Sequence, residues 1–251
     1  MKLTDKISKW LKEYLQQNKL EAFVVGVSGG IDSAVTSTLC ARTGIPTIAI
    51  NMPLHSKDVN TNLSNLHLEW LRKNYDNVKT DVICLDSIFG AFFEVMQKYD
   101  HDLGFANSKS RLRMVSLYQI AAKTGGIVVG TGNKVEDFGV GFFTKYGDGG
   151  VDISPIADLT KTQVRKLAKE LGIESSIIEA APTDGLWEDA RSDEDQIGAS
   201  YEELEWAMNY LEKKATFKLT ARQKEVIAIY KKFNEANFHK MKNIPVFQVE
   251  E

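Results

Sequence analysis

Four short apolar runs recur in the first half of the chain, and longer amphipathic stretches separate them. The runs cover residues 22–27, 46–51, 80–85 and 126–131. Their length and their flanking turn residues are typical of buried strands. The stretches between them are long enough for helices, which are predicted at 31–42, at 56–74 and, as a pair, between 87 and 123. Because strands that alternate with helices form a parallel sheet covered on both faces, the pattern predicts an α/β fold with a doubly wound parallel sheet.

The last third of the chain has helical periodicity and no further strong strand. Helices are predicted at 159–171, 201–214 and 221–236. Thr160 is suited to cap the first of them, and Gly172 is suited to end it in a left-handed conformation. Gly44 and Gly125 are predicted to end two earlier helices in the same way. Residues 1–251 are therefore expected to form a single α/β domain with helical C-terminal additions.

The composition narrows the class of protein. The chain has 251 residues, is 43% hydrophobic and carries a formal net charge of −3. This acidity argues against a nucleic-acid-binding protein, which would usually show a basic excess. Residues 1–16 place apolar side chains on one face of a helix without a continuous apolar stretch, so neither a signal peptide nor a membrane span is expected. A cytoplasmic protein with no membrane partner follows.

The two cysteines, Cys40 and Cys84, lie far apart and lack the C-x-x-C spacing of redox and metal sites. Both fall in apolar surroundings and are predicted to be core residues. No Ser-His-Asp arrangement is visible either. The sequence therefore indicates no side-chain nucleophile.

The segment G-V-S-G-G-I-D-S-A at 26–34 carries the strongest chemical signal. It follows the first predicted strand, has no bulky residue from Ser28 to Gly30, and leads directly into a helix. A glycine-rich turn lets the backbone approach an anion, and the helix start supplies free N–H groups and a positive dipole end. Ser28 and Ser33 add hydroxyl donors. Because ligands bind at the carboxyl ends of strands in open α/β sheets, the segment predicts a phosphate-binding loop.

Two common phosphate loops are excluded, because neither G-x-x-x-x-G-K-[ST] nor G-x-G-x-x-G occurs here. Asp32 would repel a bare phosphate, but its place in the loop is explained if Mg²⁺ bridges the carboxylate to phosphate oxygens. The alternative is a tight strand-to-helix turn in which Asp32 caps the helix.

The motif S-G-G-x-D-S resembles the pyrophosphatase loop of the N-type ATP pyrophosphatases, which include GMP, asparagine and NAD synthetases. The resemblance implies a Rossmann-like, adenine nucleotide alpha hydrolase-like fold and transfer of AMP from ATP to an acceptor oxygen. The loop residues that it implies for ATP binding are Gly26, Val27, Ser28, Gly29, Gly30, Ile31, Asp32 and Ser33.

Further segments resemble NAD synthetases in particular. These segments are N-S-K-S-R-L-R-M at 107–114, G-T-G-N-K-V-E at 130–136, F-T-K-Y-G-D at 143–148, D-I-S-P-I at 152–156, and P-T-D-G-L-W with the D-E-D-Q-I-G that follows it, within 181–205. Together with the loop at 26–34, these segments follow the same order as in the family and extend the resemblance over nearly the whole chain. The spacing from Glu136 to Lys145 is one residue longer than in some family members, which puts the local loop geometry in question. The two arginines, Arg111 and Arg113, are expected at the start of a helix.

The resemblance also assigns roles. Asp32 and Glu136 would hold Mg²⁺, and together with Lys161 they would be the catalytic residues. Thr131, Lys161 and Thr183 would join the loop in binding ATP. The second substrate, deamido-NAD, would be bound by Arg111, Lys145, Asp152, His239 and Lys240. Because Asp32 and Glu136 are distant in sequence, they can meet only if their strands are neighbours in the sheet.

The activity implied by the resemblance is the amidation of deamido-NAD by ammonia at the expense of ATP, the last step of NAD synthesis. An acyl adenylate is the expected intermediate, with NAD, AMP and pyrophosphate as products. The first predicted helix begins near residue 4, so no glutamine amidase domain is expected and free ammonia would be the nitrogen source. The family resemblance also implies a homodimer.

Two other functions remain open from sequence. Another ATP pyrophosphatase, such as a tRNA-thiolating or GMP-forming enzyme, would share the loop, although a tRNA enzyme should show a basic face and often functional cysteines. A non-catalytic nucleotide-binding module would need an adenine pocket but not the set of Asp32, Glu136, Lys145 and Lys161. ATP turnover distinguishes the module from the enzymes.

Overall fold

Four parallel strands form one sheet in the order β3-β2-β1-β4. The strands are β1 (Ala22–Gly26), β2 (Thr47–Asn51), β3 (Val78–Val82) and β4 (Gly126–Val128). The computed structural model describes residues 1–54, 58–180, 192–213 and 218–249. The parallel α/β architecture predicted from the alternating pattern is confirmed.

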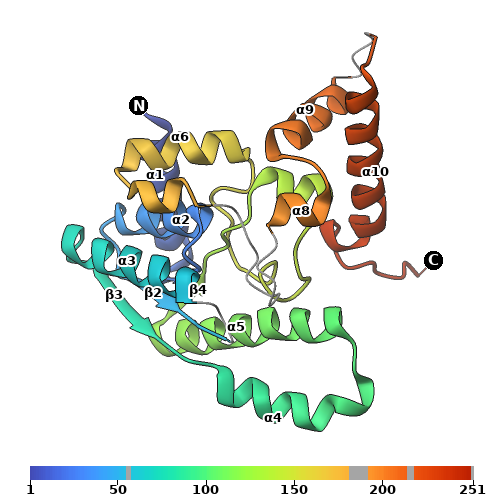
Figure 1. Ribbon diagram of the computed structural model, residues 1–251. Helices are drawn as coiled ribbons and strands as arrows, with labels where there is room; N and C mark the ends of the chain where they lie inside the picture. Colours follow the sequence, from blue (N-terminus) through green and yellow to red (C-terminus); the bar gives the residue numbers. More distant parts are fainter. Residues whose placement is uncertain (55–57, 181–191, 214–217, 250–251) are drawn as a thin grey trace.

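Helices account for most of the remaining chain (Figure 1). Those of the first half are α1 (Leu3–Asn18), α2 (Ile31–Ala41), α3 (Asp58–Asn74), α4 (Asp86–Met96) and α5 (Asp102–Thr124). The second half contributes the π-helical turn η2 (Lys134–Val140), α6 (Lys161–Leu171), α7 (Ser175–Ile178), α8 (Asp193–Ile197), α9 (Tyr201–Glu212) and α10 (Ala221–Met241). Within the described ranges, none of these helices combines the length and apolarity needed to cross a membrane.

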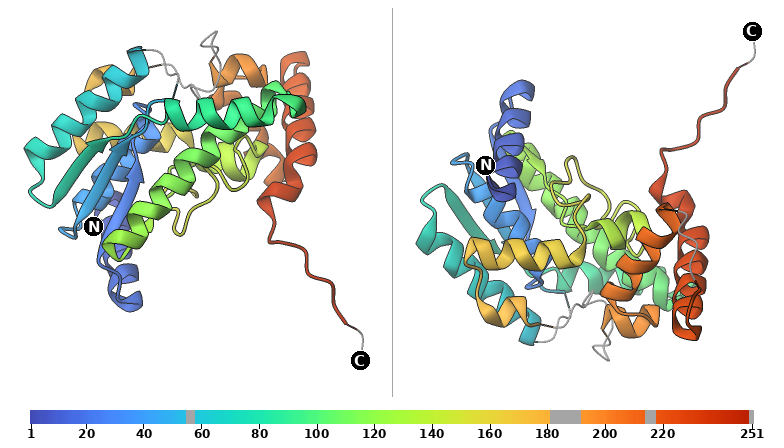
Figure 2. Two further views of the ribbon diagram at one scale, coloured as in Figure 1. Left: turned by 90° about the horizontal axis from the view of Figure 1, so that it is seen from below. Right: turned by 90° about the horizontal axis from the view of Figure 1, so that it is seen from above.

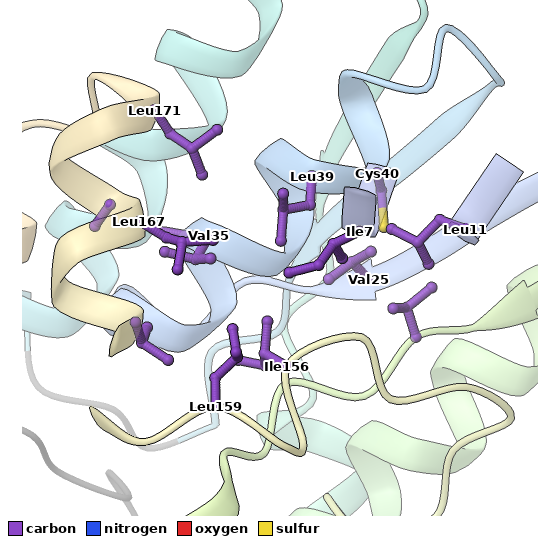
Figure 3. Close-up of a cluster of buried hydrophobic side chains, with 14 of the residues drawn as sticks. Ile7, Leu11, Val25, Val35, Leu39, Cys40, Ile156, Leu159, Leu167 and Leu171 are labelled. Carbon is purple, nitrogen blue, oxygen red and sulfur yellow. The ribbon is translucent and has the colours of Figure 1, made fainter. Parts of the chain in front are cut away.

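The sheet is covered on both faces because side chains alternate along each strand. Phe23 and Val25 of β1 join a buried cluster with residues of α1, α2 and α6, whereas Val24 between them packs with Ala121 of α5. Figure 3 shows the first cluster, in which Val25 and the side chains from the three helices point toward one another. In Figure 1, α1, α2 and α6 lie on one side of the sheet, and α4 and α5 on the other.

The strand order creates a reversal point between β1 and β4. The chain proceeds from β1 outward to β2 and β3, then returns through α4 and α5 to place β4 on the other side of β1. Phe23 is paired with Thr47 of β2 and with Ile127 of β4. In open α/β sheets, the loops that diverge at such a point leave a crevice at the carboxyl ends of the strands.

The C-terminal helices form a second group beside the sheet. Helices α9 and α10 pack against η2, and their shared core contains Val135, Leu204 and Tyr230. Figures 1 and 2 show this group at one end of the molecule, with the C-terminal segment extending away from it. The predicted helical additions are therefore confirmed, and they pack on the segment that follows β4.

Most of the predicted helix ends are also present. Thr160 caps α6 in a capping box with Gln163, and Gly172 ends the helix with a φ of 74°. Gly125 ends α5 with a φ of 60°. Gly44 does not end α2 itself, because that helix ends at Ala41 with Arg42 as a right-handed cap; Gly44 has a φ of 76° in the turn that follows. Glycine adopts this left-handed conformation without the steric cost of a side chain.

The prediction for the third strand was wrong in position and burial. The strand spans Val78–Val82 rather than 80–85, and Lys79 and Asp81 on it are exposed. β3 is an edge strand, so it is less covered than the central strands, and the apolar residues at 83–85 belong to the turn before α4. Cys84 is consequently exposed, whereas Cys40 is buried as predicted. β4 is shorter than predicted, and Val129 beyond it makes an isolated bridge with Ile153.

A buried histidine supports the helix that follows the phosphate loop. His67 of α3 is fully buried, its Nε2 lies 2.9 Å from the Ser37 hydroxyl of α2, and its ring stacks on Trp70. Burial lowers the pKa of His67 from 6.5 to about 4. The imidazole is therefore neutral in the folded protein at pH values where it is charged in the unfolded chain.

Stability is expected to fall as the pH is lowered from 6.5 toward 4, because only the unfolded chain binds a proton at His67 in this window. The loss attributable to His67 between pH 7 and pH 5 is about 2 kcal/mol. Urea unfolding of the wild type and of His67→Gln at both pH values measures it, since glutamine does not titrate. Equal pH dependence in the two proteins would contradict the assignment.

Candidate active site

A cavity of about 830 Å³ opens at the carboxyl ends of β1 and β4. Its walls come from the glycine-rich loop, from α5, from the segment at 129–151 and from α10. This volume is typical of pockets that hold a nucleotide-sized ligand. The cavity therefore lies where the strand order predicts a ligand site.

The glycine-rich loop forms a tight turn that leads into α2. Gly29 has a φ of 87°, a left-handed conformation that favours glycine. The Ser28 amide donates a hydrogen bond to the Ser33 hydroxyl at 3.1 Å, and that hydroxyl lies 2.9 Å from the Gly30 carbonyl. The first N–H groups of α2 have no partners within the helix and point toward the loop, as an anion site requires.

The three predicted catalytic side chains meet at this end of the cavity. The Lys161 ammonium lies 2.5 Å from Asp32 Oδ2 and 3.0 Å from Glu136 Oε1. The Lys161 side chain is only 3% exposed, and each carboxylate is 16% exposed. Asp32 follows β1 and Glu136 follows β4, so the adjacency of these strands brings together residues about 100 positions apart.

Asn133, which sequence reasoning missed, fixes both carboxylates. Its side-chain oxygen accepts hydrogen bonds from the amides of Val135 and Glu136 and so caps η2. Its amide nitrogen donates to Asp32 Oδ1 at 3.3 Å. Asp32 is thus turned toward Asn133 and Lys161, which disfavours the alternative in which it caps α2; that cap position belongs to Gly30. The signal was present as the asparagine of G-T-G-N.

The segment from Glu136 to Lys145, whose length put the loop geometry in question, begins in an unusual helix. Residues 134–140 form a π-helical turn, in which hydrogen bonds join residues five rather than four positions apart and which often occurs at functional sites. Glu136 lies on this turn and still reaches Lys161. The longer spacing therefore does not displace the carboxylate from the site.

The charges of the three groups are strongly coupled. Burial by itself would lower the pKa of Lys161. The two carboxylates raise that pKa by more than burial lowers it, so the ammonium stays charged. Burial also raises the pKa of Asp32, with a contribution from the charge of Glu136. Burial would raise the pKa of Glu136 as well, but Lys161 and a hydrogen bond from Tyr201 outweigh it and lower the pKa. Two carboxylates beside one ammonium suit an additional cation.

The chemistry of these donors fits Mg²⁺. In the described part of the chain, no cluster of three or more His, Cys, Asp or Glu side chains could hold a metal ion by itself. A Mg²⁺ ion in a nucleotide site needs only one or two carboxylates, because phosphate oxygens and water complete its octahedron. Asp32 and Glu136 are the residues that would hold it.

The opposite part of the cavity is lined by basic side chains. Arg111, Lys145, His239 and Lys240 all lie on its wall. Arg111 donates to the Lys145 carbonyl at 3.3 Å, and the Lys145 ammonium lies 3.3 Å from the His239 carbonyl. The Lys240 ammonium donates to the Phe143 carbonyl at 2.7 Å, and burial lowers its pKa. α5, α10 and the segment after η2 thus jointly present positive charge to an anionic ligand.

Some of the remaining predicted residues line the cavity and others do not. Thr131 and every loop residue from 26 to 33 except Gly29 line the cavity. Asp152 does not line it; its carboxylate accepts hydrogen bonds from the Tyr118 hydroxyl and the Val128 amide. Thr183 lies outside the described residues. Arg111 is well inside α5 rather than at a helix start, because α5 begins at Asp102.

Comparison with known proteins identifies the family. The model of the NAD synthase family matches residues 3–243 of this chain. The chain belongs to the NAD synthase family. It is accordingly a ligase that uses ATP.

Individual proteins are also similar to this chain over most of its length. The NH(3)-dependent NAD(+) synthetase of Thermoplasma acidophilum is 36% identical over 235 residues, which cover 92% of each chain. The protein of the same name from Sulfurisphaera tokodaii is 38% identical over 81% of this chain and 71% of its own. Among solved structures, an NMN synthetase from Francisella tularensis has a TM-score of 0.88 at 31% identity and covers 98% of both chains. An NH3-dependent NAD synthetase from Campylobacter jejuni has a TM-score of 0.81 at 26% identity, with 98% and 97% covered.

Proposed function

We propose that this member of the NAD synthase family amidates deamido-NAD with ammonia and ATP, forming NAD, AMP and pyrophosphate. The observation that carries the proposal is that one cavity joins the phosphate loop and its Asp32–Lys161–Glu136 cluster to a second cationic wall. A site for ATP and a site for an anionic co-substrate thus share one cavity. A binding module for a single nucleotide would not need the second wall.

The chemistry explains why both sites are needed. A carboxylate does not react with ammonia directly, because oxide is a very poor leaving group. Attack of the nicotinate carboxylate on the α-phosphorus of ATP releases pyrophosphate and makes an acyl adenylate. Ammonia then attacks the acyl carbon and releases AMP. The side chains that line the cavity include no thiol and need supply no nucleophile, so positioning and charge neutralisation account for catalysis.

Different residues of the chain bind the phosphates, neutralise charge and position the second substrate. The turn of Ser28 to Ser33 and the start of α2 receive the phosphates of the leaving group. Lys161 supplies a buried positive charge that offsets the negative charge developing on the pyrophosphate. Bound Mg²⁺ would add Lewis-acid stabilisation of the same oxygens. Arg111, Lys145 and Lys240 hold the phosphates of the second substrate and present its carboxylate to ATP.

Nicotinate mononucleotide is a second candidate substrate. It is favoured by the similarity in fold to the NMN synthetase of Francisella tularensis, whereas the curated relatives are named NAD synthetases. Both substrates present the same nicotinate carboxylate and a phosphate. The cationic wall of Arg111 and Lys240 suits either of them, so a direct comparison of rates is required.

We also propose a homodimer. Along α4 and α5 several large apolar side chains are exposed, including Ile88 at 52%, Val95 at 75% and Val115 at 58%. Surfaces of this kind on a single chain mark contact with a partner. Light scattering at assay concentration is expected to report the mass of two chains, and a monomeric mass would contradict the proposal.

Product analysis tests the activity. Purified protein is incubated with ATP, Mg²⁺, ammonium and deamido-NAD, and each component is omitted in turn. NAD and AMP are expected together and only in the complete mixture. Replacement of deamido-NAD by nicotinate mononucleotide tests the second candidate through the yield of NMN. ATP turnover without either product would assign another acceptor, and no turnover would favour a binding module.

Loss of the Lys240 ammonium is expected to weaken binding of the second substrate selectively. In Lys240→Met the KM for that substrate should rise about 10-fold, because a charge-assisted hydrogen bond to phosphate is lost. The KM for ATP should change less than about twofold, since Lys240 belongs to the opposite wall. Steady-state kinetics measure both values.

The neighbouring exposed residue Lys242 provides the matched control. Lys242→Met removes the same charge from the same end of α10 without touching the cavity wall. It should leave both KM values unchanged. Equal effects of the two substitutions would show that only the overall charge matters.

A further inference from the structure

Tyr201 contacts two of the three groups that meet at the phosphate site. Its hydroxyl donates a hydrogen bond to Glu136 Oε1. Its ring lies beneath the Lys161 ammonium, which is 4.6 Å from the ring centroid. An ammonium over an aromatic face is attracted by the ring electrons, and more strongly when both are shielded from water. One side chain therefore restrains the carboxylate and the ammonium together.

Tyr201 is itself held rigidly. Its side chain is fully buried in the cluster that joins α9 and α10 to η2. Its amide donates a hydrogen bond to Glu194 Oε1 at 2.8 Å, and its hydroxyl lies 3.3 Å from Asp193 Oδ2. A side chain packed in this way keeps one rotamer, so its hydroxyl is presented to Glu136 in a defined position.

The contacts on Glu136 leave room for a metal ion. Tyr201 and Lys161 both bind the same oxygen, Oε1. Both of these contacts use Oε1, so the second oxygen of the carboxylate can turn toward a cation. Without the tyrosine hydroxyl, Oε1 would be held by the Lys161 ion pair, which would compete with the metal for the same carboxylate.

We infer that Tyr201 is a positioning residue that orients Glu136 and Lys161 for the metal-bound phosphates of ATP. It acts from α9, which belongs to the same helical group as α10 with His239 and Lys240. The packing of the C-terminal helices is thereby connected to the geometry of the phosphate site. The inference rests on the proposed use of ATP and Mg²⁺ at this site.

The test replaces only the hydroxyl. Tyr201→Phe keeps the ring, and Mn²⁺ serves as a probe for the metal because free Mn²⁺ is counted by electron paramagnetic resonance. In the presence of ATP, Mn²⁺ is expected to bind Tyr201→Phe about 10-fold more weakly than wild type, since a hydrogen bond to a charged group is worth about 10- to 100-fold. The Mg²⁺ concentration for half-maximal rate should rise similarly, with the KM for deamido-NAD unchanged.

Tyr230→Phe is the matched control. Tyr230 lies in the same cluster, and in the described residues its hydroxyl makes no hydrogen bond with Glu136. This variant should bind Mn²⁺ as wild type does. If it loses as much affinity as Tyr201→Phe at a similar loss in Tm, the role of Tyr201 is packing alone and the inference is overturned.

A double-mutant cycle tests the route of the effect. In the Glu136→Gln background, Tyr201→Phe should change Mn²⁺ affinity less than about threefold, because residues that act through one another are not additive. If Tyr201→Phe weakens Mn²⁺ binding by the same factor in the wild-type and Glu136→Gln backgrounds, the inference is overturned. Failure of the wild type to make NAD, with the Mn²⁺ effect intact, would reject only the proposed substrate. NAD synthesis with wild-type Mn²⁺ binding in Tyr201→Phe would reject only the role of Tyr201.

Discussion

Replacing Asp32 with asparagine is expected to lower the rate of amidation by about 1,000-fold, the loss typical of removing one preorganised charge at a reacting phosphate. Asparagine has nearly the same shape, but its one side-chain oxygen can accept from only one of Asn133 and Lys161, which donate to different oxygens of Asp32. It cannot offer a negative oxygen to Mg²⁺. The kcat at saturating ATP and Mg²⁺ measures the loss, and circular dichroism checks that the fold is retained.

Asp158→Asn is the control for this substitution. Asp158 pairs with Lys134 on the surface and its side chain is 96% exposed. Its loss should leave the rate within about twofold of wild type, because exposed ion pairs contribute little. A wild-type rate in Asp32→Asn would exclude the proposed metal role of the carboxylate.

Replacing Lys161 with methionine is expected to abolish turnover and also to destabilise the protein by about 2–4 kcal/mol. The ammonium is the only cation between two poorly exposed carboxylates in the described part of the site, and its removal leaves their charges in repulsion. The methionine keeps most of the volume, so the loss reflects charge rather than a cavity. Urea unfolding at pH 7.5 measures it.

The destabilisation should depend on pH. Without Lys161, the folded-state pKa values of Asp32 and Glu136 rise, so the folded protein gains protons as the pH is lowered. Lys161→Met should therefore be less destabilised, relative to wild type, at pH 5.5 than at pH 7.5. Lys134→Met, which breaks an exposed pair, should change stability by less than about 0.5 kcal/mol at either pH. An equal loss at both pH values for Lys161→Met would indicate lost packing instead.

Local patterns in the sequence predicted those parts of the fold and the site that depend on neighbours in the chain. Continuous apolar runs identified the central strands, because these strands are buried on both faces, and helical periodicity identified most helices, because one face of each is buried. Thr160, Gly125 and Gly172 marked helix ends through their own conformational chemistry. The prediction failed at β3, since an edge strand lacks the burial that produces an apolar run.

Only part of the candidate site could be predicted from the sequence. Asp32, Glu136 and Lys161 could be named from motifs, each beside a strand or helix end. Asn133 lay inside a quoted motif, but its two hydrogen bonds depend on the turn that follows β4. Tyr201 lay within the segment 181–205 that resembles the family, but no role was assigned to it, because an aromatic residue near a helix start is most simply explained as core packing.

The sequence by itself determined the alternation of strands and helices, the phosphate-binding turn and the types of residue available for chemistry, since each depends on residues close together in the chain. Only the tertiary structure decided which of them meet. The order β3-β2-β1-β4 places Asp32 beside Glu136, and the packing of α6 and α9 brings Lys161 and Tyr201 to the same point. Such contacts join residues up to 129 positions apart and arise from the burial of many surfaces at once, which no local pattern encodes.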